Sequence, residues 1–351
     1  MEVLEEVAEV EVFPDVRRQI SLQETIAGAA RSDYLVGLHG NFVPAEVFDA
    51  NPHLKGVAFL GGLTMKVDFE AALKYRVPVV SSMHGAMSDV PGGPGAATAD
   101  LTVSMVLAHA YRLLDADRYT RACPTFQEQT MALMGLGCPG KTVGLVGLGR
   151  VGRPMARRFR AFDMRILYNK RTRLAPEEED EIGIEWMDFD TLLAESDFVC
   201  VEVSYNPSTH KMFGAREFAL MKPTAYFINT ARGRIVDEDA LIDALESKMI
   251  AGAALDVYYN EPSAVWDPQV PAALREMHNV ILAPHNGNAT YEVRNRQIMP
   301  LAVGIRDLIE GRRPAGLMNP EIYGAPTLYP QFYGRGPIFP IDAGPTHFLS
   351  T

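Results

Sequence analysis

A glycine-rich turn between an apolar segment and a helical segment constrains the fold of this chain more than any other feature. The turn is Gly147–Gly152, with the sequence Gly-Leu-Gly-Arg-Val-Gly. It follows residues 142–146, an apolar run that predicts a short strand, and it leads into residues 150–162, whose apolar positions recur at helical spacing. A GxGxxG sequence alone is a weak signal, but a strand before it and a helix after it are typical of a dinucleotide-binding unit.

Each glycine of this turn has its own physical role. Gly147 allows the tight turn, Gly149 lets the backbone approach a pyrophosphate, and Gly152 lets the helix pack closely against the strand. The N-terminus of the helix presents free N–H groups and a partial positive charge to the phosphates. The turn therefore predicts a nicotinamide dinucleotide site, in which Arg150 and Val151 add further contacts.

Apolar segments alternate with helical segments on both sides of the turn. The expected strands are 142–146, 165–168, 198–203, 225–230, 251–257 and 280–283 in the centre, and 34–38, 57–60 and 77–80 near the start. Strands that alternate with helices, such as 237–248, indicate a parallel sheet covered on both faces. The sequence therefore predicts an α/β fold with two Rossmann-like or flavodoxin-like domains, parallel sheets and a cleft between the domains.

Two long helical segments, 97–121 and 289–309, border the central part of the chain. Helices of this kind are natural connections between domains, and 351 residues are too many for one typical domain. We expect a dinucleotide-binding domain at residues 104–287. The substrate-binding domain is then built from both chain ends, residues 1–103 and 288–351.

The end of the second central strand bears on the choice of dinucleotide. An NAD site has a carboxylate about 20 residues after the turn, which accepts a hydrogen bond from the ribose 2′-hydroxyl. Here that position is near Asn169, and three cations follow it: Lys170, Arg171 and Arg173. Cations attract the 2′-phosphate that a carboxylate would repel. The sequence predicts a preference for NADP(H), with NAD(H) left open and a solvated basic loop as the alternative reading.

Three charged residues, Arg232, Glu261 and His285, each follow an expected strand. Ligands of open parallel sheets bind beyond the carboxyl ends of the strands, so the three residues are expected on the edge that carries the glycine turn. Histidine can supply a proton near neutral pH, a carboxylate beside it favours the imidazolium form, and arginine grips a carboxylate through two hydrogen bonds. A lone histidine or arginine is more often structural, so the prediction depends on their joint placement.

These motifs together resemble the D-isomer-specific 2-hydroxyacid dehydrogenase family, with a likeness to its glyoxylate and hydroxypyruvate reductases, over roughly residues 1–323. The matching segments are 147–152, 229–241, 256–262 and 284–287. The resemblance implies that His285 is the acid/base, that Glu261 is its partner, and that Arg232 binds a small 2-keto or 2-hydroxy acid. It also implies cofactor contacts from six residues: Val203, Thr230, Ala231, Asp256, His285 and Gly287. It implies no metal.

The expected substrate segment departs from the family pattern. Gly61 and Gly62 can offer backbone N–H groups to a substrate carboxylate. Leu63 stands where a second family glycine usually falls, however, and Met65-Lys66 replaces an Asp-Asn pair. Substrate identity is therefore not predicted.

Three further segments differ from the family. The loop 82–97 looks longer, and the aromatic, proline-rich tail beyond Tyr323 is additional, with packing as its expected role. Residues 1–8 resemble the end of the family's first helix, so the family's first strand is expected to be missing. Either the tail replaces that strand or the start of the chain is truncated.

Composition limits the partners and the compartment. The net charge of −11 and the pI near 5.3 argue against nucleic acid and against an anionic membrane. The three cysteines show no CxxC spacing, the N-terminus lacks the basic region of a secretory signal, and no apolar run can span a bilayer. A cytoplasmic location is expected.

Two classes of function remain open. The first is an NADPH-dependent reductase of a small 2-keto acid, which acts as a homodimer through the cofactor domain and the helix near 97–121. Formate dehydrogenase is disfavoured because that relative has glutamine where Glu261 stands, and phosphoglycerate dehydrogenase is disfavoured by the missing acid near Asn169. The second class is a dinucleotide-sensing regulatory protein on the same fold, which the altered substrate segment favours.

Overall fold

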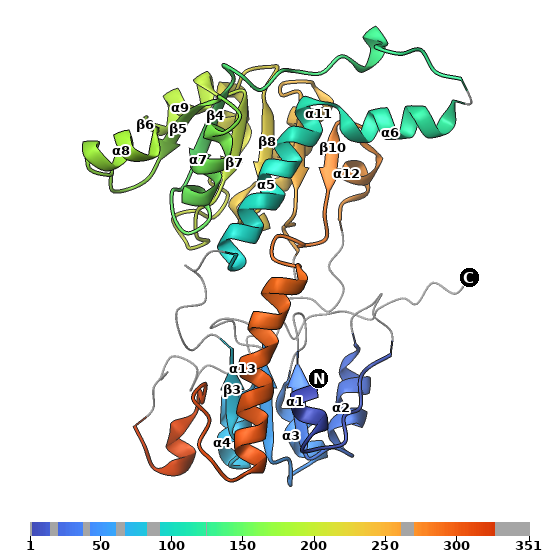
Figure 1. The fold of residues 1–351 in the computed structure, drawn as a ribbon, viewed down its shortest axis with the longest axis vertical. Helices are drawn as coiled ribbons and strands as arrows, with labels where there is room; N and C mark the ends of the chain where they lie inside the picture. The colour runs from blue at the N-terminus through green and yellow to red at the C-terminus, as the bar shows by residue number, and fades with distance from the viewer. Residues whose placement is uncertain are drawn as a thin grey trace. The chain divides into compact units, whose positions relative to one another are not determined.

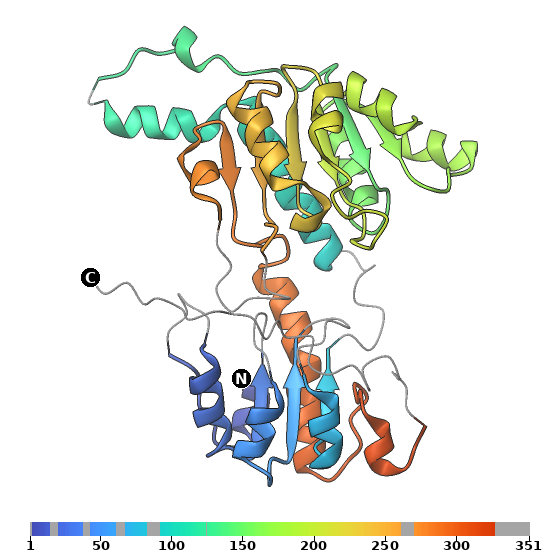
Figure 2. The ribbon, with the colours of Figure 1, turned by 180° about the vertical axis from the view of Figure 1, so that it is seen from behind.

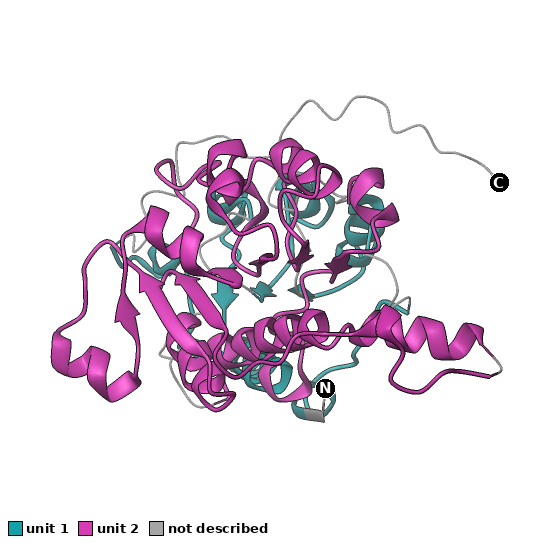
Figure 3. Cartoon of the chain, turned by 90° about the horizontal axis from the view of Figure 1, so that it is seen from above, with its two compact units in different colours: residues 1–87, 262–268, 294–351 teal, residues 88–261, 269–293 magenta. Residues whose placement is uncertain are grey.

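The chain folds into two compact units. In the computed structural model the described residues are 2–14, 20–37, 43–60, 67–82, 92–123, 125–260 and 270–326. One unit comprises residues 1–87, 262–268 and 294–351, and the other comprises residues 88–261 and 269–293 (Figure 3). The limits that the sequence suggests for the functional domains, near residues 103 and 287, stay a prediction.

The second unit is built on a parallel sheet of seven strands. They are β4 (Thr142–Val146), β5 (Arg165–Asn169), β6 (Glu185–Trp186), β7 (Phe198–Val201), β8 (Tyr226–Asn229), β9 (Gly252–Leu255) and β10 (Val280–Leu282). Their order is β10-β9-β8-β7-β4-β5-β6, and every neighbouring pair is parallel. The strand order therefore reverses between β4 and β7, which is where open α/β sheets bind ligands. The predicted α/β fold with parallel sheets is confirmed, and β6, only two residues long, is the strand that the sequence did not predict.

Helices cover both faces of this sheet (Figure 1). The helices are α5 (Pro94–Ala110), α7 (Gly152–Arg160) and α8 (Pro176–Ile182) on one side, and α9 (Phe189–Glu195), α10 (Ala215–Leu220), α11 (Glu238–Glu246) and α12 (Ala272–Glu276) on the other. Alternate residues of each strand serve the two cores: in β7, Val199 and Val201 face α9–α11, whereas Phe198 and Cys200 face α5 and α7. Strands buried on both faces explain why these segments read as continuous apolar runs.

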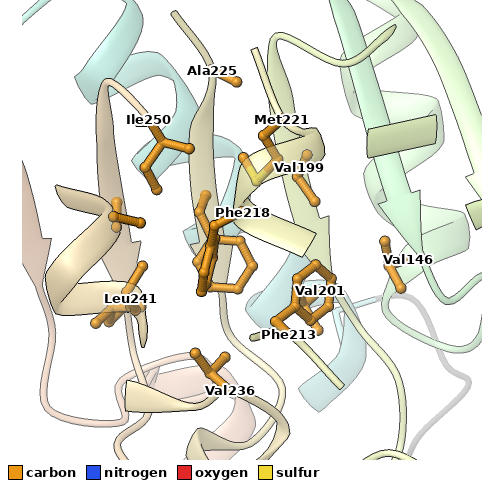
Figure 4. Packing of buried hydrophobic residues seen from close by; sticks show 14 of the residues in the cluster. Val146, Val199, Val201, Phe213, Phe218, Met221, Ala225, Val236, Leu241 and Ile250 are labelled. Carbon is orange, nitrogen blue, oxygen red and sulfur yellow. The ribbon is translucent and has the colours of Figure 1, made fainter. Parts of the chain in front are cut away.

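The core beneath α10 and α11 is aromatic (Figure 4). The ring centroids of Phe213 and Phe227 are 5.0 Å apart, and Phe218 meets Phe227 edge-on at 5.2 Å. Val201 and Val236 lie beside these rings. Close-packed rings of this kind fix the sheet as a rigid platform for the loops at its carboxyl edge.

The segment expected as one helix over 97–121 is two helices, so that prediction is wrong. Helix α5 ends at Ala110, and α6 (Leu113–Ala122) begins after Arg112, whose φ of +49° is left-handed. A right-handed helix cannot continue through a left-handed residue. The carbonyl of Ala110 accepts instead from the Leu136 N–H at 2.6 Å. Helix α6 has no buried residue, and Figures 1 and 2 show it projecting from its unit.

The first unit holds a three-stranded parallel sheet, visible in Figure 2. The strands are β1 (Tyr34–Gly37), β2 (Gly56–Phe59) and β3 (Val79–Ser81), in that order. Helices α2 (Leu22–Ala29), α3 (Ala45–Ala50) and α4 (Phe69–Lys74) pack on one face, and α1 (Glu2–Glu5) and α13 (Tyr291–Ile309) pack on the other. Both chain ends thus contribute to this unit.

Residues 316–319 extend the first unit's sheet at β3. The Asn319 side chain accepts from the Val79 N–H and donates to the Val77 carbonyl, both at 2.8 Å. Among the described residues β1 is therefore the opposite edge strand. The loop 83–91 and the tail from 327 lie outside the described residues. Both alternatives for the family's first strand, replacement by the tail or a truncated start of the chain, therefore stay predictions. Of the helices described, none is long and apolar enough to cross a membrane.

Candidate cofactor and substrate site

Two glycines of the turn after β4 are tightly packed, and the third has open space beside it. Gly147 has a φ of +105°, and a Cβ there would lie 2.6 Å from the Glu202 carbonyl oxygen. A Cβ on Gly152 would lie 2.5 Å from the Gly147 oxygen. At Gly149, by contrast, no atom of the described residues lies within 4 Å of the position of a Cβ, apart from Gly149 itself and its chain neighbours. The open side fits the backbone approach of a pyrophosphate, whereas the other two glycines are needed by the turn itself.

Helix α7 begins directly at this turn. Its N-cap residue, Val151, makes no side-chain hydrogen bond to the helix, and its first turn contains no acidic residue. The free N–H groups and the helix dipole therefore remain available to an anion. Together with the open side at Gly149, this arrangement fits the diphosphate of a dinucleotide.

The cations after β5 differ in their partners. Arg173 is held by Glu179 through two hydrogen bonds of 2.8 and 2.7 Å, and Tyr168 donates to the same carboxylate at 2.6 Å. Lys170 and Arg171 form no ion pair with any residue that the structure describes. The hydrogen bonds from Arg173 and Tyr168 lower the pKa of Glu179 to about 2. A 2′-phosphate would therefore find its free cations at Lys170 and Arg171 rather than at Arg173.

Asn169 itself links this strand end to the glycine turn. Its carbonyl accepts from the Gly147 N–H at 2.9 Å, and its side-chain amide donates to the Met187 carbonyl at 2.8 Å. The position at which an NAD site would have a carboxylate is thus occupied by a neutral side chain with its own backbone partner.

The loops after β9 and β10 are tied together by one carboxylate. Asp256, 1% exposed, accepts from the Asn286 N–H at 2.6 Å and from the Gly287 N–H at 2.8 Å. The His285 N–H donates to the Asp256 carbonyl at 2.9 Å, and His285 has a left-handed backbone with φ of +57°. Asp256 therefore fixes the turn that presents the exposed His285 side chain.

The loop after β8 packs against the loop after β9. A Cβ on Gly233 would lie 1.9 Å from the carbonyl carbon and oxygen of Tyr258, so only glycine fits there. The Asn229 side chain accepts from the Ala231 N–H at 3.0 Å and donates to the Arg232 carbonyl at 3.1 Å. The exposed Arg232 guanidinium is thus carried by a backbone that is fixed from two directions.

Glu202, which follows β7, belongs to this group of residues and was missed by the sequence analysis. Its carboxylate oxygen is in short hydrogen-bonding contact with the hydroxyl of Thr230 and lies 3.5 Å from that of Thr102. Burial raises the pKa of Glu202 to about 7, with Asp256 acting in the same direction and the hydroxyls and Arg232 opposing it. The available signal was an acid at the end of an apolar strand, the position that also marked the other site residues.

The structure thus gathers most of the expected site residues at one edge of the seven-stranded sheet. Those brought to this edge are the glycine turn, Asn169–Arg171, Val203, Thr230, Ala231, Arg232, Asp256, His285 and Gly287. Glu261, Gly61 and Gly62 lie outside the described residues. In the part of the chain that the structure describes, no three His, Cys, Asp or Glu side chains form a group that could hold a metal.

Comparisons with known proteins agree with this geometry. A sequence model described as "D-isomer specific 2-hydroxyacid dehydrogenase, NAD binding domain" matches residues 103–287. A Staphylococcus aureus (strain USA300) protein named "Putative 2-hydroxyacid dehydrogenase" is 36% identical over 319 residues, which are 91% of this chain and 96% of that protein.

Two solved structures extend the comparison to the fold. A glyoxylate reductase from Paecilomyes thermophila has a TM-score of 0.62 at 30% identity, over 89% of this chain and 92% of that chain. The D-lactate dehydrogenase with NAD+ from Lactobacillus jensenii also has a TM-score of 0.62, at 27% identity, over 85% of this chain and 89% of that chain.

The family predicted from the sequence is therefore confirmed, and with it an oxidoreductase class and a nicotinamide dinucleotide cofactor. The chain belongs to the D-isomer-specific 2-hydroxyacid dehydrogenase family.

Proposed function

We propose that this protein uses NADPH to reduce a small 2-keto acid to the corresponding D-2-hydroxy acid. The observation that carries the proposal is the placement of Arg232, Asp256 and His285 after three neighbouring parallel strands, on the edge that holds the glycine turn. Two similar structures are named as a glyoxylate reductase and a D-lactate dehydrogenase, which supports a small 2-keto or 2-hydroxy acid as the substrate.

The side chains at this edge have distinct parts in the reaction. Arg232 binds the substrate carboxylate through paired hydrogen bonds. His285 donates a proton to the carbonyl oxygen as that oxygen becomes a hydroxyl, and Glu261 favours the imidazolium form that carries this proton. The bound reduced nicotinamide supplies the hydride for the carbonyl carbon. For Gly61 and Gly62 we propose a role in substrate binding.

The preference for NADP(H) rests on the residues after β5. No acid stands at Asn169 to accept from a ribose 2′-hydroxyl, and Lys170 and Arg171 have no ion-pair partner among the described residues. A 2′-phosphate would supply the partner that these two cations lack. Arg173, held by Glu179, has a smaller part in this binding.

A homodimer is the proposed assembly, with α6 and the residues after it at the interface. Six large apolar side chains of this region are exposed: Tyr111, Leu113, Leu114, Phe126, Met131 and Met134. Exposed apolar side chains that gather on a projecting segment are typical of a protein–protein interface.

A panel of 2-keto acids, each assayed with NADPH and with NADH at the nicotinamide absorbance, tests the proposal. We expect oxidation of NADPH with at least one small 2-keto acid and a lower kcat/KM with NADH. If tight NADPH binding is found without turnover of any acid, the dinucleotide-sensing alternative is favoured. If NADH is bound more tightly than NADPH, the cofactor preference is wrong.

A further inference from the structure

The loop that follows β5 is closed by one buried hydroxyl. The Tyr168 hydroxyl accepts a hydrogen bond from the Leu174 N–H at 2.9 Å and donates one to the Glu179 carboxylate at 2.6 Å. Tyr168 and Leu174 are both buried and belong to the same hydrophobic core, so water has little access to replace the contact between them. The chain thus returns, six residues later, to the strand that it has just left.

The segment 170–173 is anchored both where it begins and where it ends. Asn169, the last residue of β5, precedes it and is hydrogen-bonded through its carbonyl and through its side-chain amide. At the other end, Arg173 donates two hydrogen bonds to Glu179, and its guanidinium lies 5.6 Å from the centroid of the Trp186 ring. These anchors restrict the backbone of the segment before any ligand binds.

The hydrogen-bond donors of this segment have no partner in the part of the chain that the structure describes. This holds for the backbone N–H groups of residues 170–173 and for the side chains of Lys170, Arg171 and Thr172. Arg171 and Thr172 are exposed. Two cations, a hydroxyl and successive backbone N–H groups are donors that a phosphate accepts from. The anchored segment therefore presents a set of donors suited to a phosphate.

A segment that is ordered in advance binds a ligand more tightly than one that the ligand must order. Fixing a backbone and long side chains costs conformational entropy, and this cost is subtracted from the free energy of binding. Lys170 and Arg171 have long side chains, so the backbone that carries them is the part that the protein can fix beforehand. Only a ligand with a group that reaches these donors gains from this order, and NADH lacks the 2′-phosphate.

We propose that Tyr168 is a positioning residue for the cofactor: its hydroxyl holds residues 170–173 in the conformation that receives the 2′-phosphate, and so strengthens the binding of NADPH relative to NADH. The inference rests on the proposed function, in which Lys170 and Arg171 bind that phosphate. Tyr168 is fully buried, so it acts through its hydrogen bond with Leu174 rather than by contact with the phosphate.

The closed loop is tested in the protein without cofactor, by hydrogen exchange at single amides corrected for their intrinsic rates. We expect the Leu174 amide to exchange at least about tenfold more slowly than those of residues 171–173, because it alone among them is hydrogen-bonded. Tyr168→Phe keeps the ring in the core and removes the hydroxyl, so Leu174 should then exchange as fast as its neighbours. A wild-type Leu174 amide that already exchanges as fast as they do overturns the proposal.

The effect on the cofactor is tested by fluorescence titration with NADPH and NADH, which differ only in the 2′-phosphate. In Tyr168→Phe we expect the dissociation constant for NADPH to rise about 3- to 30-fold and that for NADH to change less than about twofold. The matched control is Tyr226→Phe in the same sheet. Tyr226 is the first residue of β8, and its hydroxyl has no hydrogen-bond partner among the described residues, so both constants should stay unchanged.

The outcomes separate this inference from the proposed function. Equal losses of NADPH and NADH binding in Tyr168→Phe, or no loss of either, overturn the role of Tyr168. If the wild-type protein binds NADH more tightly than NADPH, the proposed cofactor preference fails. A selective loss of NADPH binding in Tyr168→Phe then still supports the role of Tyr168, and its absence overturns it. The exchange rate of the wild-type Leu174 amide decides against the closed loop even if Tyr168→Phe does not fold.

Discussion

At the scale of single residues, the proposed chemistry depends on His285, whose backbone is held by Asp256. The Asp256 carbonyl and carboxylate together accept three backbone N–H groups of residues 285–287. The imidazole of His285 stands exposed on that turn. Its removal therefore leaves the turn and the glycine-rich site intact.

We expect His285→Ala to lower kcat at least about 100-fold, the range in which general acid catalysis contributes. The dissociation constant for NADPH, measured by fluorescence titration, should change less than about threefold, because the glycine turn and the cations after β5 are untouched. Turnover close to that of the wild-type protein would remove His285 from the role of proton donor.

Of the three cations after β5, Arg173 is held by Glu179, whereas Lys170 and Arg171 have no ion-pair partner among the described residues. Lys170→Ala combined with Arg171→Ala should raise the dissociation constant for NADPH about 10- to 100-fold, because two charge-assisted contacts are lost, and should leave that for NADH nearly unchanged. Arg173→Ala is the matched control and should affect NADPH less. A larger effect of Arg173→Ala would show that its ion pair with Glu179 opens to receive the phosphate.

The same ion pair makes a prediction for stability against acid. The pKa of Glu179 is lowered from 4.5 to about 2, so its ionised form is stabilised by folding. This stabilisation is fully present above pH 4.5 and is lost as the pH falls from there towards 2. In urea unfolding, the wild-type protein should lose more stability over that range than Glu179→Gln. Parallel pH profiles of the two proteins would contradict the assignment.

At the scale of elements, the loops after β8 and β9 are locked together where Gly233 meets Tyr258. Gly233→Ala places a Cβ against a backbone that cannot move without shifting Arg232, and we expect a loss of about 1–3 kcal/mol of unfolding free energy. Gly214→Ala is the control: its backbone is extended and the nearest atom is a flexible Glu217 oxygen at 3.6 Å. Equal effects of the two substitutions on the unfolding midpoint would argue against the close packing.

Helix α6 carries the prediction on assembly. Leu113→Glu combined with Leu114→Glu places charges on exposed apolar positions of α6, so the fold of the unit should be unaffected. We expect light scattering to show a dimer for the wild-type protein and a monomer for the variant. A variant that remains a dimer would place the interface elsewhere.

At the scale of the whole molecule, the sheet was predictable because each buried strand reads as an apolar run. Residues 142–146 and 198–201 fall within the predicted strands, and the GxGxxG turn fixed their relation to α7. The break at Arg112 was not predictable, because apolar positions continue at helical spacing through it. The helix ends there because Arg112 is left-handed and the Ala110 carbonyl accepts from the Leu136 N–H. The sequence pattern predicts neither feature.

The site residues that belong to a sequence motif could be predicted. Contacts between residues that lie far apart in the sequence could not. Arg232, Asp256 and His285 follow strands that share one edge, so their gathering follows from the parallel sheet. Glu202 also follows such a strand, but its contact with Thr102, one hundred residues earlier in the chain, forms only in the folded protein. Likewise the partner of Arg173 becomes visible only when α8 folds back over β5.

The left-handed residue Arg112 has a consequence for how such a protein can diverge. It ends α5 and starts a ten-residue helix that has no buried side chain, so the residues of the proposed dimer interface are separated from those of the proposed active site. Substitutions on α6 are not constrained by packing against the sheet. Substitutions at the sheet edge are not constrained by packing against α6. With the proposed interface on α6, quaternary structure and substrate range can evolve, or be engineered, independently of one another.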